Sequence, residues 1–127
     1  MRILHVGFGA SCERNADLFF QGLLGLEKSA PVTLSAELCQ GIFTVQRELL
    51  LIHYNGPGIH LEVFIDPLYR APEPTVLHTC IEVDDQARFL EQCGAAGLKT
   101  SRTPRGDGFV SFVHDFDNNL FEIKQKK

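Results

Sequence analysis

One histidine and one glutamate in each half of the chain have the types and spacing needed to hold a divalent metal ion together. The four residues are His5, Glu62, His78 and Glu122. Imidazole nitrogens and carboxylate oxygens together suit Zn, Ni, Mn, Fe or Co. A bound cation would also offset the repulsion and lost hydration of two carboxylates in one cavity. The alternative is that both glutamates face solvent on an open sheet and both histidines are ordinary polar residues. Their matching positions in an internal repeat favour the metal centre.

Strand alternation explains how these four side chains could share a surface, because successive side chains of a strand point to opposite faces. Each of the four lies in a strand-like segment among alternating apolar residues: Leu4–Phe8, Ile59–Ile65, Val76–Val83 and Leu120–Ile123. We expect the apolar residues, including Leu4, Val6 and Phe8, to face the helices. The histidines and glutamates then lie on the sheet face that points away from the helices.

The two halves of the chain repeat the same order of elements, a strand, a helix and further strands. Helices are expected over Cys12–Leu24, capped by Ser11, and from Asp84 or Asp85 to Cys93. Strands are expected at Ile3–Gly9, Val32–Leu38, Gly41–Gln46, Glu48–Tyr54, Ile59–Ile65, Val76–Val83, Lys99–Thr103, Gly108–His114 and Leu120–Lys124. The first two strands after the first helix could be one strand broken at Gly41. Each half is thus interpreted as a βαβββ module.

A βαβββ module exposes one apolar sheet face, so two modules must pair to bury it. Pro67–Pro74 contains three prolines and no hydrophobic period, as expected of a linker. We expect an α+β protein with one domain over residues 1–127. Module one covers about 1–66, the linker 67–74 and module two about 75–127.

Composition excludes two classes of partner. The net charge of -4 and pI near 5.7 argue against nucleic-acid binding. No segment approaches the roughly 18 apolar residues of a membrane span, and no signal peptide is visible, so a cytoplasmic protein is expected. The four cysteines lack CxxC spacing. Their even number permits disulfides, but reduced and mostly buried thiols are the favoured interpretation.

Four segments resemble the vicinal oxygen chelate superfamily, and the likeness covers nearly the whole chain. The segments are Leu4-His5-Val6, Leu61-Glu62-Val63, His78 to Asp85, and Asp115 to Ile123. The last is similar to the superfamily's common D-P-D-G-N-x-x-E run, with Phe116 in place of Pro and Asn118 in place of Gly. Order and spacing together make the resemblance specific for the superfamily, which includes glyoxalase I, methylmalonyl-CoA epimerase, extradiol dioxygenases, fosfomycin-resistance enzymes and bleomycin-binding proteins.

The resemblance implies two βαβββ modules forming a curved, barrel-like mixed sheet around a metal site, with the helices outside. It also implies a homodimer. In this superfamily either both modules of one chain close a site, or modules are exchanged across the dimer. The linker is compatible with both arrangements.

Among superfamily members, glyoxalase I-like enzymes resemble this chain most, because they have a carboxylate at the position of Glu62. Epimerases commonly have Gln there and a His-Pro-Lys turn where this chain has His114 to Asp117. Fosfomycin-type and dioxygenase-type sites use three protein ligands, and bleomycin-binding proteins lack the metal set. The resemblance therefore implies a lyase or isomerase of the lactoylglutathione lyase type. Another metalloenzyme of the superfamily (epimerase, dioxygenase or fosfomycin-type thiol transferase) or a non-catalytic small-molecule binder stays open as the alternative.

The implied chemistry is proton transfer through a metal-stabilised enediolate, on a small carbonyl substrate such as the hemithioacetal of methylglyoxal and glutathione. By resemblance Glu122 is the catalytic base, and Glu62 is the other candidate. Ni or Zn is the expected metal, with Mn, Co and Fe also compatible.

Residues that would contact the substrate are less well marked in the sequence, and no glutathione pocket is identifiable. Arg105 is the preferred partner for an anionic group, since glycines flank its loop, although a surface role for it is the simpler alternative. Phe43 is assigned to the cavity wall, or else to the core. His60 either orients Glu62 or is an edge histidine without a role, which is favoured. Neither His53 nor His114 is assigned a function.

Overall fold

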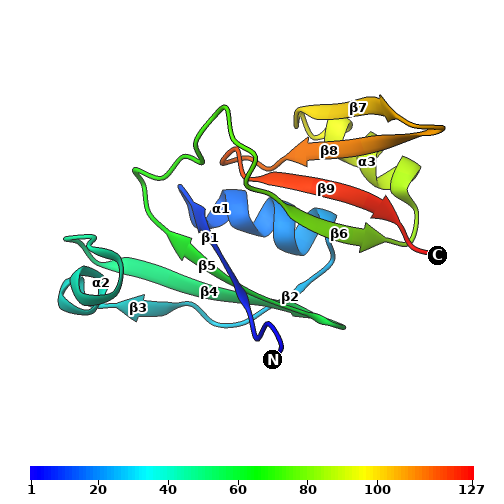
Figure 1. The fold of residues 1–127 in the computed structure, drawn as a ribbon. Coiled ribbons are helices and arrows are strands. Elements are labelled where there is room, and N and C mark those ends of the chain that lie inside the picture. The colour runs from blue at the N-terminus through cyan, green and yellow to red at the C-terminus, as the bar shows by residue number, and fades with distance from the viewer. The chain divides into compact units, whose positions relative to one another are not determined.

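The computed structural model describes all 127 residues and divides the chain into two compact units, Met1–Arg70 and Ala71–Lys127. Each unit has its own mixed sheet (Figure 1). Helices and mixed sheets together confirm the predicted α+β class. No helix of the structure is both long enough and apolar enough to span a bilayer.

Unit 1 contains a sheet in the order β1-β5-β4-β2, with β3 also paired to β4. Its elements are β1 (Val6–Ala10), α1 (Glu13–Ala16), the π-helical continuation η1 (Asp17–Leu23), β2 (Glu27–Lys28), β3 (Val32–Leu34), α2 (Ala36–Phe43), β4 (Leu49–Gly56) and β5 (Ile59–Ile65). Strand β1 runs parallel to β5, and β4 runs antiparallel to it. The two-residue loop Pro57-Gly58, with φ of 74° at Gly58, closes the β4–β5 hairpin.

Unit 2 is the βαβββ module that the sequence predicts, with the sheet order β6-β9-β8-β7. Its elements are β6 (Thr79–Val83), α3 (Gln86–Ala95), β7 (Thr100–Arg105), β8 (Gly108–His114) and β9 (Leu120–Gln125). Asp85 caps α3, because its Oδ1 accepts a hydrogen bond of 2.9 Å from the Arg88 N–H. The parallel pair here is β6 with β9, as β1 with β5 in unit 1.

Aromatic packing anchors the helix of unit 1 to its sheet. Phe19, Phe20 and Tyr54 are fully buried. The Phe20 ring lies 5.3 Å from the rings of both Phe19 and Tyr54, and 5.7 Å from that of Phe8. Phe8 therefore faces the helix as predicted, whereas Leu4 is 68% exposed, because β1 begins only at Val6. In unit 2 the buried residues Phe89 and Cys93 of α3 face a sheet with buried Val113, Phe121 and Ile123.

The strand predicted at Gly41–Gln46 is wrong, and the one at Val32–Leu38 is shorter than predicted. The chain forms only the three-residue β3 and then the helix α2. Ser35 caps α2, because its Oγ accepts a hydrogen bond of 3.2 Å from the Leu38 N–H. The left-handed residue Thr44, with φ of 59°, ends the helix. Unit 1 thus departs from the βαβββ module in two ways: two short strands, β2 and β3, both pair with β4, and the helix α2 lies between β3 and β4.

The expected cap at Ser11 is wrong, whereas the expectation of reduced thiols is confirmed and that of mostly buried ones holds for two of the four. The first helix has Cys12 at its N-cap without a capping side chain, since the Ser11 hydroxyl instead accepts a hydrogen bond from the Asn15 amide. All four cysteines are free thiols; Cys39 and Cys93 are buried, while Cys12 and Cys80 are exposed.

Candidate metal centre

The first predicted pair, His5 and Glu62, meets on the sheet face of unit 1 that points away from the α1–η1 helix. Glu62 lies on β5 between the buried residues Leu61 and Val63, whose side chains point to the opposite face. His5 immediately precedes β1. Its Nε2 lies 3.4 Å from Glu62 Oε2, and the glutamate side chain is 20% exposed. The predicted alternation therefore holds on β5.

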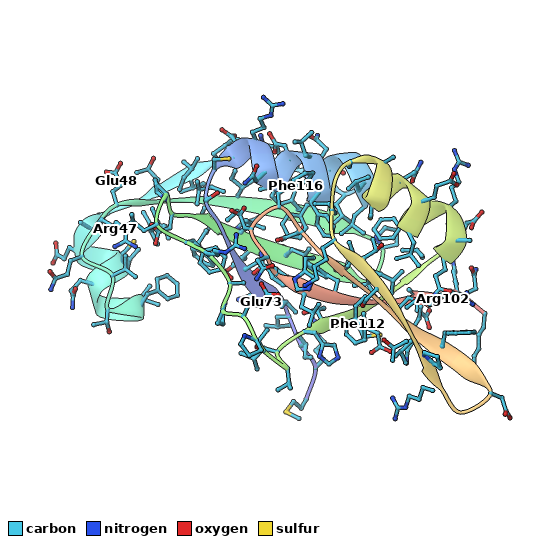
Figure 2. The ribbon with its side chains drawn as sticks, turned by 90° about the horizontal axis from the view of Figure 1, so that it is seen from above. Arg47, Glu48, Glu73, Arg102, Phe112 and Phe116 are labelled. Carbon is cyan, nitrogen blue, oxygen red and sulfur yellow. The ribbon has the colours of Figure 1, made fainter.

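The second predicted pair, His78 and Glu122, forms the corresponding arrangement in unit 2. His78 Nε2 lies 3.7 Å from Glu122 Oε2, and the glutamate side chain is 15% exposed. The His78 Nδ1–H donates a hydrogen bond of 2.8 Å to the Val76 carbonyl oxygen, which orients the ring with Nε2 toward the carboxylate. The Phe112 ring packs edge-on against His78 at 5.3 Å (Figure 2).

The donor chemistry of both pairs fits a divalent transition-metal ion. Each pair presents one imidazole nitrogen and one carboxylate oxygen at a separation close to that of adjacent ligands on a metal, about 3.3 Å for bonds near 2.1 Å. No arginine is paired with either carboxylate. Glu122 has one cationic neighbour, Lys124, whose Nζ lies 3.6 Å from Oε1 on a side chain that is 58% exposed.

His53 is a functional candidate that the sequence analysis missed. It pairs directly with Glu62 across β4 and β5, and its Nε2 lies 3.7 Å from Glu62 Oε1. The signal was present in the sequence, because a two-residue loop at Pro57-Gly58 fixes the hairpin register that brings these residues together. His60 lies beside them, with its ring 5.3 Å from that of His53.

Cys80 is the second missed neighbour, at the position where β6 pairs with Glu122 of β9. Partial burial and then the adjacent Glu122 carboxylate raise the pKa of the Cys80 thiol. The thiol is therefore protonated at neutral pH and is a poor nucleophile there. Strand alternation places it on the same face as His78, two residues earlier in the chain.

Two buried polar atoms without a hydrogen-bond partner occupy equivalent positions in the two units. They are Asn55 Oδ1 and His114 Nδ1. Asn55 pairs with His60, two residues before Glu62, and His114 pairs with Leu120, two residues before Glu122. Pairing and alternation put both on the glutamate faces of their sheets. Each glutamate face therefore carries one buried polar atom to which no group of the protein forms a hydrogen bond.

Of the two predicted substrate residues, Phe43 lies close to one of the glutamate faces. It ends α2 and is 43% exposed, and its ring packs edge-on against Phe64 at 5.0 Å. Phe64 is two residues from Glu62 on the same face of β5. The two rings together form an apolar wall beside the first pair.

Arg105 is not brought to the second pair. By register it shares a sheet face with Glu122, but it ends β7, two strands away and four residue steps further along, about 13 Å at 3.3 Å per residue. It is exposed at the tip of the β7–β8 hairpin. Arg47, labelled in Figure 2, belongs to unit 1, where its Nε–H donates a hydrogen bond of 2.9 Å to Asp66.

The loop that precedes β9 is held by a buried carboxylate. Asp115 accepts hydrogen bonds of 2.9 Å from the N–H groups of Asp117 and Asn119, and one of 2.7 Å from the Asn119 amide. Burial outweighs these bonds and raises the pKa of Asp115 to about 6. Asn118 adopts the left-handed conformation, with φ of 69°. The turn therefore sets where β9 begins, and with it the position of Glu122.

Comparison with known proteins finds structural but no sequence relatives: no described family and no curated protein matches the sequence. A glyoxalase family protein from Enterococcus faecalis is similar over 96% of this chain and 95% of its own, with 20% identity and a TM-score of 0.72. A fosfomycin resistance protein, FosX, from Listeria monocytogenes, complexed with Mn(II) and dihydroxypropylphosphonic acid, matches over 97% and 88%, with 16% identity and a TM-score of 0.74.

A third match is the trypanothione-dependent glyoxalase I of Leishmania major, over 98% of this chain and 86% of that one, with 16% identity and a TM-score of 0.69. At sequence identities of 16 to 20%, the TM-scores of 0.69 to 0.74 establish the fold and nothing finer. The resemblance seen in the sequence is thereby confirmed at that level, and the chain has the fold of the vicinal oxygen chelate superfamily.

Proposed function

We propose that this chain is a metal-dependent enzyme of glyoxalase I type, with His5, Glu62, His78 and Glu122 as the ligands of one divalent ion. The observation that carries the proposal is the matched pair of His–Glu contacts, 3.4 Å in unit 1 and 3.7 Å in unit 2, on equivalent parallel strand pairs. A homodimer and Ni or Zn as the ion are part of the proposal. When bound, the ion would supply Lewis acidity toward two neighbouring oxygens of a small carbonyl substrate.

Glu122 is the proposed base. It would take a proton from the carbon beside the carbonyl and return it to the neighbouring carbon, so the reaction is an isomerisation without net proton uptake. Its carboxylate is largely buried, and the Phe112 ring packs against the His78 imidazole beside it. The hydrogen bond from His78 to Val76 fixes the orientation of the imidazole.

Glu62 is the proposed permanent ligand, because each of its oxygens faces a histidine. Oε2 lies near His5 and Oε1 near His53, which restrains the carboxylate on both sides. Phe43 would contact apolar parts of the substrate through the wall it forms with Phe64. Arg105 would contact an anionic substrate group only after movement of its hairpin tip.

A fosfomycin-type enzyme is the second candidate, and the His53–Glu62 contact favours it. If Glu62 stays with His53, three ligands remain, His5, His78 and Glu122. Two histidines and one glutamate make up the three-ligand set that the resemblance associates with fosfomycin-type and dioxygenase-type sites. The two candidates differ in whether Glu62 is needed for turnover.

The test is turnover of the hemithioacetal of methylglyoxal and glutathione by the full chain loaded with Ni or Zn, with metal content measured on the same samples. We expect lactoylglutathione formation. In His5→Ala and in His78→Ala we expect loss of turnover and one bound ion fewer per chain than in the wild type. Glu91→Gln, an exposed change on α3, is the matched control and should behave as the wild type. Metal-loaded protein without turnover would contradict the glyoxalase I assignment, and turnover of fosfomycin with a thiol or water would establish the second candidate.

A further inference from the structure

Unit 1 carries a second group of metal-binding side chains that the proposed function does not use as a set. These are His53, His60 and Glu62, and each offers one ligand atom within 4.8 Å of the others. His53 and Glu62 are partly exposed and His60 is exposed, so an ion could reach them from solvent.

The hairpin places these three donors together without help from any other part of the chain. His53 of β4 is directly opposite Glu62 of β5, and cross-strand partners have Cβ atoms about 4.5–5.5 Å apart. His60 precedes Glu62 by two residues on the same strand, so its side chain points to the same face. Two of the donors, His60 and Glu62, are two residues apart on β5, and the third, His53, lies on the paired strand β4. A metal ion could therefore contact all three from one face of the hairpin.

The side-chain geometry is close to that of a bound state. His53 Nε2 lies 3.7 Å from Glu62 Oε1, whereas His5 Nε2 lies 3.4 Å from the other oxygen, Oε2. The His53 and His60 rings meet edge-on at 5.3 Å. Adjacent ligands of a tetrahedral ion with bonds near 2.1 Å are about 3.3 Å apart, so small rotations of two surface side chains suffice.

Two further observations separate this group from a chance gathering of polar residues. Asn55 lies opposite His60 on the same face, and its Oδ1 is buried without a hydrogen-bond partner, so an unused oxygen donor borders the group. The corresponding positions of unit 2 are Phe112 and Leu120, which cannot bind a metal. The two histidines are therefore a feature of unit 1 and not of the repeat.

We propose that His53, His60 and Glu62 form a divalent transition-metal site held entirely within unit 1. The donor set of two imidazoles and one carboxylate suits Zn, Ni, Co or Cu rather than Mg or Ca. The site goes beyond the proposed function, because it needs neither His78 nor Glu122. Glu62 is shared, with Oε1 directed at this site and Oε2 directed at His5.

The experiment uses the full chain with both unit 2 ligands removed, His78→Ala/Glu122→Gln. Zn(II) is titrated by calorimetry, and bound metal is counted after gel filtration. We expect one ion per chain to be retained. Adding His53→Asn or His60→Asn to this background should weaken Zn(II) binding about tenfold or more, since even supporting groups change metal affinity on that scale. Adding His114→Asn, a histidine of unit 2 outside the proposed ligands, is the matched histidine control and should leave the affinity unchanged.

A second readout is the NMR spectrum of the histidine rings of the wild-type chain during Zn(II) addition. Zn(II) should shift the resonances of His53 and His60 both in the wild type and in the double variant His78→Ala/Glu122→Gln. The resonance of His114 should shift in neither protein. If the double variant, shown to be folded by circular dichroism, binds no Zn(II), or if His53→Asn and His60→Asn leave its affinity unchanged, the site does not exist. Neither result depends on turnover, so failure of this site and failure of the proposed function are distinguishable.

Discussion

The two units share a strand frame but surround their glutamates differently. On the paired strands, Glu62 lies between Gly7 and His53, whereas Glu122 lies between Cys80 and Phe112. Both keep a histidine within 3.7 Å. The repeat therefore has one nitrogen and one oxygen donor per unit, while the positions of His53 and His60 in unit 1 hold the apolar Phe112 and Leu120 in unit 2.

This difference suggests a division of labour between the two carboxylates. A carboxylate flanked by histidines on both oxygens is held in place and serves best as a ligand. Glu122 has a single histidine neighbour, at Oε2, and its other oxygen faces the largely exposed Lys124 ammonium, so we expect it to be better suited to exchanging a proton. The predictions below test whether this contrast is functional, from the largest expected effect to the smallest.

Exchanging each glutamate for glutamine should separate the two roles. At saturating Ni or Zn, Glu122→Gln should lower kcat for the hemithioacetal by about 10²- to 10⁴-fold, the usual contribution of a positioned base. Glu62→Gln should act mainly by raising the metal concentration needed for half-maximal turnover. Equal losses of kcat in both variants at saturating metal would show that the units do not divide the work.

Two buried or paired aspartates should give the units opposite dependences of stability on pH. The folded-state pKa of Asp115 in unit 2 is raised to about 6, so its contribution to stability is full below about pH 4 and is lost as pH rises through 6. The loss should be about 2–3 kcal/mol. Arg47 lowers the pKa of Asp66 in unit 1, so that contribution is present above about pH 4 and is lost as pH falls.

Urea unfolding between pH 4 and 7 measures the contribution of Asp115 as the free energy of unfolding of the wild type minus that of Asp115→Asn. The free energy of unfolding of the wild type should fall relative to the variant as the pH rises. Asp107→Asn, in the exposed turn between β7 and β8, is the control and should not change the slope. A difference that grows in the other direction would mean that the three donated hydrogen bonds outweigh burial.

Transplanting the histidines should turn the face of unit 2 into a copy of unit 1. Phe112→His/Leu120→His places imidazoles at the equivalents of His53 and His60. In a background with His53→Asn and His60→Asn, the transplant should raise Zn(II) affinity by about tenfold or more over the control Phe112→Asn/Leu120→Asn. Calorimetry of the two folded proteins is sufficient, and equal affinities would mean that strand geometry alone does not make the site.

The smallest effect concerns Tyr54, whose equivalent in unit 2 is the apolar Val113. The Tyr54 hydroxyl donates a hydrogen bond of 2.7 Å to Asp17 Oδ1. The other carboxylate oxygen, Asp17 Oδ2, accepts a hydrogen bond from Lys28 Nζ. Burial, then this bond, raises the pKa of Tyr54 well above its ordinary value. Tyr54→Phe should lower the free energy of unfolding by about 1 kcal/mol.

A double-mutant cycle with Asp17→Asn isolates the Tyr54 contribution. Thermal unfolding of the four proteins should give a coupling energy of about the same size, about 1 kcal/mol. If the two single substitutions change the free energy of unfolding additively, the contribution of Tyr54 comes from ring packing against Phe20 and not from the hydrogen bond.

Much of the fold was predictable because its signals are local. The alternation around Glu62 and Glu122, the cap at Asp85 and the turn at Pro57-Gly58 each depend on neighbours a few residues away. The helix α2 was missed because the pattern of Ala36–Phe43 predicted a strand interrupted at Gly41. In the structure this segment is a helix capped by Ser35. The role of Arg105 could not be judged, since its distance from Glu122 depends on register across two strand pairs.

The sequence alone determined the α+β class, the repeat, the resemblance to the superfamily and the residue types that could bind a metal. These properties follow from composition, periodicity and the order of motifs, which the chain carries whether or not it is folded. Only the tertiary structure decided that Cys80 and Phe112 flank Glu122 and that Asp115 is buried. The physical reason is that strand pairing and burial join residues far apart in sequence, so their contacts and pKa shifts exist only in the folded chain.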